Sequence, residues 1–309
     1  MVRWLVIGIG DLTTKRVIPG ILAEPRSELY GVVTRDLRKA EAYPGVRAWT
    51  SLDDALKDGA VDAVYVVSPV SLHAPQTIAS LRAGKKVLCE KPVAMRYAEA
   101  QSMAAAANET GQLLGVAYFR RLFPKLMKTK RLIADGIIGQ PILAEANCHT
   151  WLNVSGREWA IDPAMAGGGP LYDIGSHRID ALNFLFGQPL KATGLRSNTV
   201  HQMNVEDSAT VMIEYAGGMR GVVDVRWNSR IPRDQFRVLG TDGEIVLDAL
   251  QGPDIRVNGA YEQIPPHSNV QYPLIENFVS AALDGMPVAC PIEEAIWTDW
   301  VTEQVMRPS

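Results

Sequence analysis

The stretch Val2–Asp11, which reads VRWLVIGIGD, decides the fold of this 309-residue chain. Its first part is a nearly unbroken apolar run, which is typical of a strand buried on both faces of a parallel sheet. Gly8 and Gly10 follow directly, and a helical pattern begins near Lys15. A strand that ends in a Gly-x-Gly turn and leads into a helix predicts a βαβ unit that binds a dinucleotide.

The two glycines have separate roles in such a turn. The first permits a sharp turn, and the second lets a pyrophosphate approach the backbone at the N-terminus of the helix. Thr13 stands where the fingerprint has a third Gly or an Ala. We therefore expect Gly8, Gly10, Asp11 and Leu12 to form a cofactor-binding turn, the alternative being a glycine turn needed only for folding.

The residues after the second predicted strand bear on the choice of cofactor. This strand covers residues 29–33, and Thr34, Arg35 and Asp36 follow it. A hydroxyl and a guanidinium suit the 2′-phosphate of NADP, whereas an acidic residue suits the ribose 2′-hydroxyl of NAD. Thr34 and Arg35 therefore predict NADP as the preferred cofactor, and Asp36 keeps NAD open as the alternative.

Strands and helices alternate through the first part of the chain. Further strands are expected at residues 63–67, 86–89 and 113–117, with helices at 15–23, 75–83 and 97–109. Short links between alternating elements predict an α/β domain with a doubly wound parallel (Rossmann) sheet. We expect this dinucleotide-binding domain to cover residues 1–121.

The pattern changes after Pro124, and residues 122–309 are expected to form a second domain of the α+β class with an open, mainly antiparallel sheet. Strands are expected at residues 142–148, 207–215, 220–227, 234–239 and 244–247, and helices at 125–135, 171–186, 272–283 and 292–305. The glycine-rich turns at 216–218 and 241–243 predict hairpins. This domain is expected to bind the substrate and to make oligomer contacts.

Composition excludes several classes of protein. The net charge of -3 argues against a nucleic-acid binder, and no apolar stretch reaches the roughly 18 residues that a membrane span requires. The three cysteines are widely spaced and include no CxxC pair, so neither a disulfide framework nor a zinc site is predicted, and a cytoplasmic location fits best. His149 and His201 lack metal-ligand spacing, so we expect no metal.

Cys89-Glu90-Lys91-Pro92 follows a predicted buried strand. It therefore lies at the carboxyl end of the sheet, where doubly wound folds bind their ligands. A lysine at this edge can donate a hydrogen bond to a substrate oxygen and can take part in proton transfer. The alternative is a surface charge with no part in catalysis.

A second group of candidate residues follows the glycine loop Gly167–Gly169. Asp173 and His177 stand four residues apart, which places them on one face of a helix. Histidine is a natural proton acceptor for an alcohol that is being oxidised, and a nearby carboxylate can orient it or bind a substrate hydroxyl. The alternative is an exposed pair that stabilises the helix.

Together these segments resemble the Gfo/Idh/MocA family of oxidoreductases. The resemblance runs in order over nearly the whole chain and rests on Gly8-x-Gly10, Ser68-Pro69 with His73, the run Ala83–Pro92, and Gly167-Gly168-Gly169 followed by Asp173-x-Gly175-x-His177. Val70 departs from the pattern, which often has Asn after the proline.

The resemblance implies hydride transfer between NADP or NAD and a carbinol or carbonyl carbon of a sugar, polyol or related cyclic alcohol, by a homodimer or homotetramer. Lys91, Asp173 and His177 match catalytic or substrate-contacting positions of the family. Weaker candidates for substrate contacts are Tyr118 and Arg120, after the last strand of the Rossmann sheet, and Trp159 and Asp162, in the loop before the glycines. The expected cofactor-binding residues are Gly8, Gly10, Asp11, Leu12, Thr34, Arg35, Ser68, Pro69, His73, Glu90 and Lys91.

Two other functions stay open. Some members of the family hold the dinucleotide tightly and use transient oxidation to cleave glycosides. A relative could also serve as a non-enzymatic regulator that senses a dinucleotide. The joint presence of Lys91, Asp173 and His177 argues against the regulator.

Overall fold

The computed structural model describes residues 1–155 and 158–307, which form two compact units. Unit 1 consists of residues 1–94, 98–119 and 267–295, and unit 2 of residues 95–97, 120–266 and 296–307. The division into domains of residues 1–121 and 122–309 stays a prediction. In the structure the chain returns to unit 1 near its C-terminus, which brings the helix after residue 271 to the Rossmann sheet.

Unit 1 contains a six-stranded parallel sheet in the order β3-β2-β1-β4-β5-β6. The strands are β1 (Val2–Ile7), β2 (Ser27–Val33), β3 (Arg47–Trp49), β4 (Ala63–Val66), β5 (Lys86–Cys89) and β6 (Leu114–Val116). The predicted doubly wound sheet is confirmed. Strand order reverses between β1 and β4, and ligands of such folds bind outside the carboxyl ends of the strands at this switch point.

Helices flank the unit 1 sheet. They are the π-helical turn η1 (Thr13–Val17), α1 (Ile18–Ala23), the 3-10 turns η2 (Leu37–Ala40) and η3 (Val70–Leu72), α2 (Leu52–Leu56), α3 (His73–Arg82), α4 (Tyr97–Thr110) and α8 (Tyr272–Asp284). Helix α8 packs against β1, where the rings of Trp4 and Phe278 lie 5.2 Å apart. It also contacts α1, because Gly20 leaves room for the Ile275 side chain.

Unit 2 is built on an eight-stranded mixed sheet in the order β14-β13-β12-β11-β7-β10-β9-β8. The strands are β7 (Pro141–Trp151), β8 (Lys191–Ser197), β9 (Ser208–Glu214), β10 (Arg220–Arg226), β11 (Asn228–Gly240), β12 (Glu244–Leu247), β13 (Asp254–Val257) and β14 (Ala260–Gln263). Only β7 and β10 pair in parallel among these described strands, so the predicted mainly antiparallel sheet is confirmed.

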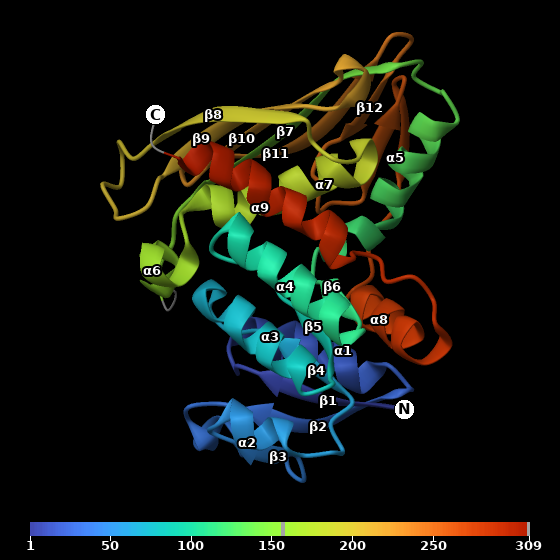
Figure 1. Ribbon diagram of the computed structural model, residues 1–309. Coiled ribbons are helices and arrows are strands. Elements are labelled where there is room, and N and C mark those ends of the chain that lie inside the picture. The colour runs from blue at the N-terminus through green and yellow to red at the C-terminus, as the bar shows by residue number, and fades with distance from the viewer. Residues whose placement is uncertain (156–157, 308–309) are drawn as a thin grey trace. The chain divides into compact units, whose positions relative to one another are not determined.

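One face of this sheet is covered by helices (Figure 1). The helical segments of unit 2 are η4 (Phe119–Leu122), α5 (Pro124–Ala134), η5 (Glu158–Ile161), α6 (Pro163–Ala166), the π-helical turn η6 (Leu171–Gly175), α7 (Ser176–Phe186), η7 (Ala216–Gly218) and α9 (Ile292–Met306), the first and last of which begin in unit 1. Arg121 and Asp180 form an almost fully buried ion pair at 2.8 Å, which ties α7 to the segment before α5. Leu182 of α7 packs over Gly221 of β10.

Several elements differ from the expectations. Strands β3, β8, β13 and β14 were not predicted, because their short or polar sequences show no regular alternation of apolar residues. The helix expected over residues 171–186 begins with a π-helical turn, so the assumption of one regular α-helix is wrong for its first five residues. Both hairpin turns are confirmed, since η7 joins β9 to β10 and residues 241–243 join β11 to β12.

Within the described residues, no helix has the length and apolar character needed to cross a membrane. The same residues contain no group of three or more His, Cys, Asp or Glu side chains that could hold a metal ion. Cys89, Cys148 and Cys290, all of them described, are buried and form no disulfide.

Candidate functional site

The glycine turn after β1 has the geometry of a dinucleotide cradle. Gly8 has a φ of 94°, and a Cβ atom there would lie 2.8 Å from the carbonyl oxygen of Val67, so the chain itself requires glycine at this position. A Cβ atom on Gly10 would meet nothing within 4 Å. The space beside Gly10 is therefore open to a ligand, and the following helix begins there, with Thr14 donating its N–H to the Gly10 carbonyl at 3.0 Å.

The residues after the turn are held in place by their own contacts. Thr13, at the third fingerprint position, is buried and donates from its hydroxyl to the Gly8 carbonyl at 2.8 Å. This hydrogen bond secures the turn in a way that Gly or Ala could not. Asp11 is exposed and pairs with Lys15 at 2.6 Å, while Leu12 is half-buried. The open backbone and the helix N-terminus fit a pyrophosphate.

Basic side chains gather at the carboxyl end of β2. Thr34 is buried and its hydroxyl contacts the backbone of Asp36, whereas Arg35 is exposed. The Asp36 carboxylate accepts two hydrogen bonds from the Arg38 guanidinium, both at 2.9 Å, and this pairing lowers the pKa of Asp36. Lys39 donates to the Ile9 carbonyl at 3.2 Å, so a cation from this segment reaches the glycine turn.

The buried carboxylate of Glu90 holds the loop after β5 in place. Glu90 accepts hydrogen bonds at 2.9 Å from the Tyr65 hydroxyl and from the Gln271 amide, and a third at 3.2 Å from the backbone N–H of Lys91. Burial raises the pKa of Glu90. The Glu90 side chain, expected among the cofactor ligands, is buried in the protein interior. Lys91 is half-buried, and the peptide bond between Lys91 and Pro92 is cis.

His73 links two loops at this edge of the sheet. One ring nitrogen lies 2.9 Å from the Ser68 carbonyl after β4, and the other lies 2.8 Å from the Pro92 carbonyl after β5. Burial lowers the pKa of His73, while the contacts with the two carbonyls oppose this shift. The ring nitrogens are thus directed at the protein backbone. Ser68 also donates from its hydroxyl to Gln76 at 2.6 Å, and Pro69 is half-buried beside it.

In unit 2, the triple glycine is required by close packing. A Cβ atom on Gly167 or Gly168 would collide with the Tyr172 ring, at 2.6 Å and 2.5 Å respectively. A Cβ atom on Gly169 would lie 2.1 Å from the backbone carbonyl oxygen of Glu206. The expected close approach to the backbone is therefore present, and the groups that approach it are the Tyr172 ring and the Glu206 carbonyl of this chain.

Asp173 and His177 lie on consecutive helical turns of different type. Asp173 belongs to the π-helical turn η6 and is half-buried, and His177 lies in the first turn of α7 and is buried. The two residues are therefore about one helical turn apart, although the turn between them is not regular α-helix.

Cations surround this part of unit 2. Arg178 donates to Asp234 at 2.9 Å and is almost fully buried. Arg120, a weaker candidate from the sequence, is also buried and donates to Gln251 at 2.9 Å. Burial, and then the neighbouring positive charge of Arg178, lower the pKa of Arg120 to about 9, while Asp234 and Asp173 oppose the shift. Arg120 therefore interacts electrostatically with Asp173.

The other weak candidates differ in their surroundings. Tyr118 is fully buried, whereas Trp159 is 40% exposed. Asp162 caps α6, because its carboxylate accepts the Ala164 N–H at 2.9 Å. This side chain therefore has a structural role whether or not it also contacts a substrate.

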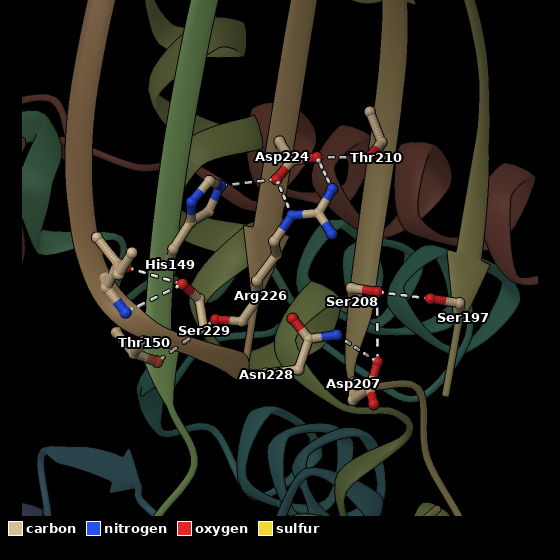
Figure 2. Close-up of polar contacts among 11 residues, drawn as sticks. His149, Thr150, Ser197, Asp207, Ser208, Thr210, Asp224, Arg226, Asn228 and Ser229 are labelled. Carbon is tan, nitrogen blue, oxygen red and sulfur yellow. Dashed lines mark hydrogen bonds and ion pairs between the residues drawn. The ribbon is translucent and has the colours of Figure 1, made fainter. Parts of the chain in front are cut away.

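His149 and His201, expected to be structural, both have protein partners. Figure 2 shows the partner of His149. His149 lies 2.7 Å from Asp224 on the outer face of the unit 2 sheet, and Asp224 also binds Arg226 and Thr210. A ring nitrogen of His201 lies 3.0 Å from the Trp227 carbonyl.

The structure brings Gly8, Ser68 and Lys91 to one edge of the Rossmann sheet, since each follows the carboxyl end of a strand. Asp173 and His177 lie together in unit 2. Sequence reasoning missed Lys39, Gln271 and Glu206, whose roles depend on contacts between segments far apart in the chain. The basic pair Arg38-Lys39 after Asp36 was the one local signal that could have indicated Lys39.

Two family profiles match the chain. Residues 2–118 match the profile described as "Oxidoreductase family, NAD-binding Rossmann fold", and residues 126–246 match the "GFO/IDH/MocA C-terminal domain". The resemblance inferred from the motifs is confirmed by these matches.

Named relatives of similar length are also found. The chain is 30% identical over 275 residues to trans-1,2-dihydrobenzene-1,2-diol dehydrogenase of Mus musculus, covering 85% of this chain and 80% of the relative. It is 31% identical over 252 residues to 1,5-anhydro-D-fructose reductase of Ensifer adhaerens, covering 80% of this chain and 75% of the relative. Among solved structures, GenD2 from gentamicin A biosynthesis in complex with NAD is 27% identical with a TM-score of 0.85, over 98% of this chain and 93% of that one.

The contrast between Gly8 and Gly10 gives a paired test of the glycine turn. We expect Gly10→Ala to leave the melting temperature unchanged, because its Cβ meets no protein atom, and to weaken NADPH binding at least about tenfold, because it intrudes where the pyrophosphate would lie. Gly8→Ala should lower stability by at least about 1 kcal/mol, because of its φ and the contact with Val67. Differential scanning fluorimetry and NADPH fluorescence titration measure the two effects, and normal NADPH affinity in Gly10→Ala would argue for a purely structural turn.

Proposed function

Because the chain belongs to the Gfo/Idh/MocA family of oxidoreductases, we propose that it transfers a hydride between a nicotinamide cofactor and a carbinol or carbonyl carbon of a sugar, polyol or related cyclic alcohol. The observation that carries the proposal is the open backbone at Gly10, beside the β1–β4 switch point and on the same sheet edge as the Lys91 loop. The proposed substrate class is taken from the names of the two relatives described above, the dihydrodiol dehydrogenase and the anhydrofructose reductase.

The bound cofactor would supply hydride acceptance or donation, and the protein would supply geometry and electrostatics. In this proposal Lys91 donates a hydrogen bond to the reacting oxygen of the substrate. His177 takes the hydroxyl proton during oxidation and returns it during reduction, and Asp173 orients the substrate or the histidine. Glu90 supports Lys91 indirectly, because its carboxylate accepts the Lys91 backbone N–H.

We propose NADP as the preferred cofactor. Arg35 is exposed at the tip of β2 and makes no ion pair with another described residue, so its guanidinium can bind a 2′-phosphate. The competing interpretation needs Asp36 to accept from a ribose hydroxyl. Its carboxylate is already held by Arg38 through two side-chain hydrogen bonds, and these would compete with the ribose.

We also propose that the protein forms a homodimer or homotetramer through the outer face of the unit 2 sheet. Leu195 is 82% exposed and Met212 is 48% exposed on this face. The charges of Asp224 and Arg226 lie on the same face, so both signs are present and two copies related by a twofold axis can pair. Helices α7 and α9 pack on the opposite face.

Replacing Lys91 tests the catalytic assignment. We expect Lys91→Ala to lower turnover by roughly 100-fold or more, with an unchanged circular dichroism spectrum, because the hydrogen-bond donor at the substrate oxygen is lost. Lys86→Ala, on the same strand β5, is the matched control and should behave as the unaltered protein. The assay follows NADPH absorbance with trans-1,2-dihydrobenzene-1,2-diol, 1,5-anhydro-D-fructose, D-xylose and myo-inositol. Near-normal turnover by Lys91→Ala would remove its role, and glycoside cleavage without net NADPH change would favour the transient-oxidation alternative.

Replacing Arg35 tests the cofactor preference. We expect the unaltered protein to bind NADPH more tightly than NADH, and Arg35→Ala to weaken NADPH binding by about 10–100-fold with little effect on NADH, since a hydrogen-bonded ion pair to the phosphate is lost. Arg47→Ala, whose side chain pairs with Asp58 on the surface, is the control. Nicotinamide fluorescence titrations give the dissociation constants. Tight binding of NADH alone would transfer the ribose contact to Asp36.

Replacing Leu195 and Met212 tests the oligomer. Sedimentation equilibrium of the unaltered protein should give a dimer or tetramer, and the double variant Leu195→Asp, Met212→Asp should sediment as a smaller species, because two buried carboxylates would face each other across the interface. Leu190→Asp, at an exposed position outside β8, is the control. A monomeric unaltered protein would disprove the proposal.

A further inference from the structure

Glu206 is a buried carboxylate beside the glycine loop of unit 2, and no sequence motif singles it out. The residue is 3% exposed, although it lies only two positions before strand β9. A buried carboxylate is costly unless hydrogen bonds compensate for the loss of water. Oε1 of Glu206 accepts the backbone N–H of Leu171 at 3.1 Å.

The segment held by this hydrogen bond leads directly to the candidate catalytic residues. Leu171 is the first residue of the π-helical turn η6, which contains Asp173. The carbonyl of Gly169 accepts the N–H of Asp173 at 3.1 Å. The Glu206 side chain therefore holds the first residue of η6, and Gly169, which packs against the Glu206 backbone, binds the Asp173 N–H through its carbonyl.

The packing around Glu206 leaves the loop little freedom. Its backbone carbonyl lies so close to Gly169 that a Cβ there would approach to 2.1 Å, and Oε2 would lie 3.2 Å from a Cβ on Gly168. Glu206 thus requires glycine at position 169, and together with the Tyr172 ring it leaves little room at position 168. The packing of Glu206 against these glycines restricts both the position and the direction of the chain where it enters η6.

The neighbouring residue, Asp207, anchors Glu206 to the sheet (Figure 2). Asp207 is fully buried, and its carboxylate accepts from the backbone of Val200 at 2.7 Å and from the Asn228 amide at 2.9 Å. Its backbone bonds to Ser197 and Trp227, both at 2.8 Å. Because the chain is fixed on both sides at Asp207, the Glu206 side chain extends from a rigid base.

We propose that Glu206 is a positioning residue, which holds the segment Gly169–Leu171 against the eight-stranded sheet and thereby sets the positions of Asp173 in η6 and of His177 in α7. The proposal rests on the proposed function, because it assigns to Glu206 an effect on turnover that acts through these two residues. Burial raises the pKa of Glu206.

The chemistry of the acceptor defines the variants. Glu206→Gln keeps a carbonyl-type oxygen for the Leu171 N–H, and Oε2 has no hydrogen-bond partner among the described residues that the new amide would displace. Glu206→Ala removes the acceptor. Glu214→Ala is the control, since this glutamate lies on strand β9, which follows Glu206. Among the residues that the structure describes, its half-exposed carboxylate pairs only with Arg220, at 3.8 Å.

The test combines hydrogen–deuterium exchange with kinetics. We expect Glu206→Ala to speed amide exchange in residues 169–176, to lower kcat by about 100-fold with a small change in KM, and to leave the NADPH dissociation constant unchanged. Glu206→Gln should restore kcat to within a few-fold of the unaltered protein, and Glu214→Ala should match it. The substrate is whichever of the four compounds named above the unaltered protein turns over fastest. If Glu206→Ala does not fold, Glu206→Asp replaces it, with the same direction of change expected.

Several results would overturn the proposal. Unaltered exchange at residues 169–176 in Glu206→Ala would show that the carboxylate does not hold the segment. Faster exchange with normal kcat would show that the segment does not position the reacting groups, and a Glu206→Gln variant as impaired as Glu206→Ala would show that the charge, not the acceptor, matters. Failure of the proposed function gives a different result, because Asp173→Asn and His177→Ala would then keep normal turnover while the exchange experiment still reports on Glu206.

Discussion

The parallel pairing of β1 with both β2 and β4 is the constraint on which the rest of unit 1 depends. It places the carboxyl ends of neighbouring strands at one edge and reverses the strand order there. The chain must turn away sharply after β1, and the carbonyl of Val67 after β4 leaves no room for a side chain at Gly8. The glycine turn, the helix N-terminus and the Lys91 loop all follow from this arrangement of strands.

The sheet brings the loops after β4 and β5 close together, and buried polar side chains then hold these loops in place. Glu90 uses its carboxylate on Tyr65, Gln271 and the Lys91 backbone, and His73 contacts the backbone after β4 and after β5. Such groups cannot reach solvent, so each missing hydrogen bond would cost about 1–3 kcal/mol. A loop held in this way loses little additional entropy when it binds a ligand.

Much of this architecture could be predicted from the sequence, and the reasons are local. The apolar run before Gly8, the alternation of strands and helices and the glycine punctuation are properties of neighbouring residues, and they led to the doubly wound sheet and the mainly antiparallel second sheet. The Lys91 loop and the Asp173–His177 segment were also identified from short motifs.

The parts that the sequence did not reveal depend on residues far apart in the chain. Gln271 reaches Glu90 across 181 positions, and Leu171 reaches Glu206 across 35. The return of residues 267–295 to unit 1 was also not predicted, because it depends on long-range contacts. The sequence of α8 indicates an amphipathic helix, but it does not indicate which sheet the helix packs against. Strand β8, with the polar sequence KATGLRS, lies at an edge of the sheet, where one neighbouring strand and a half-exposed face demand little apolar patterning.

A π-helical turn begins the helix in both candidate regions, at Thr13–Val17 and at Leu171–Gly175. Each adds a residue to a helical turn and costs stability relative to a regular α-helix, and such turns are often found at functional sites. In each case glycines precede the turn and a buried side chain secures its start, Thr13 through the Gly8 carbonyl and Glu206 through the Leu171 N–H. The same solution in two unrelated folds indicates that the cost is tolerated where the first helical turn must present its backbone or side chains in a direction that a regular helix would not provide.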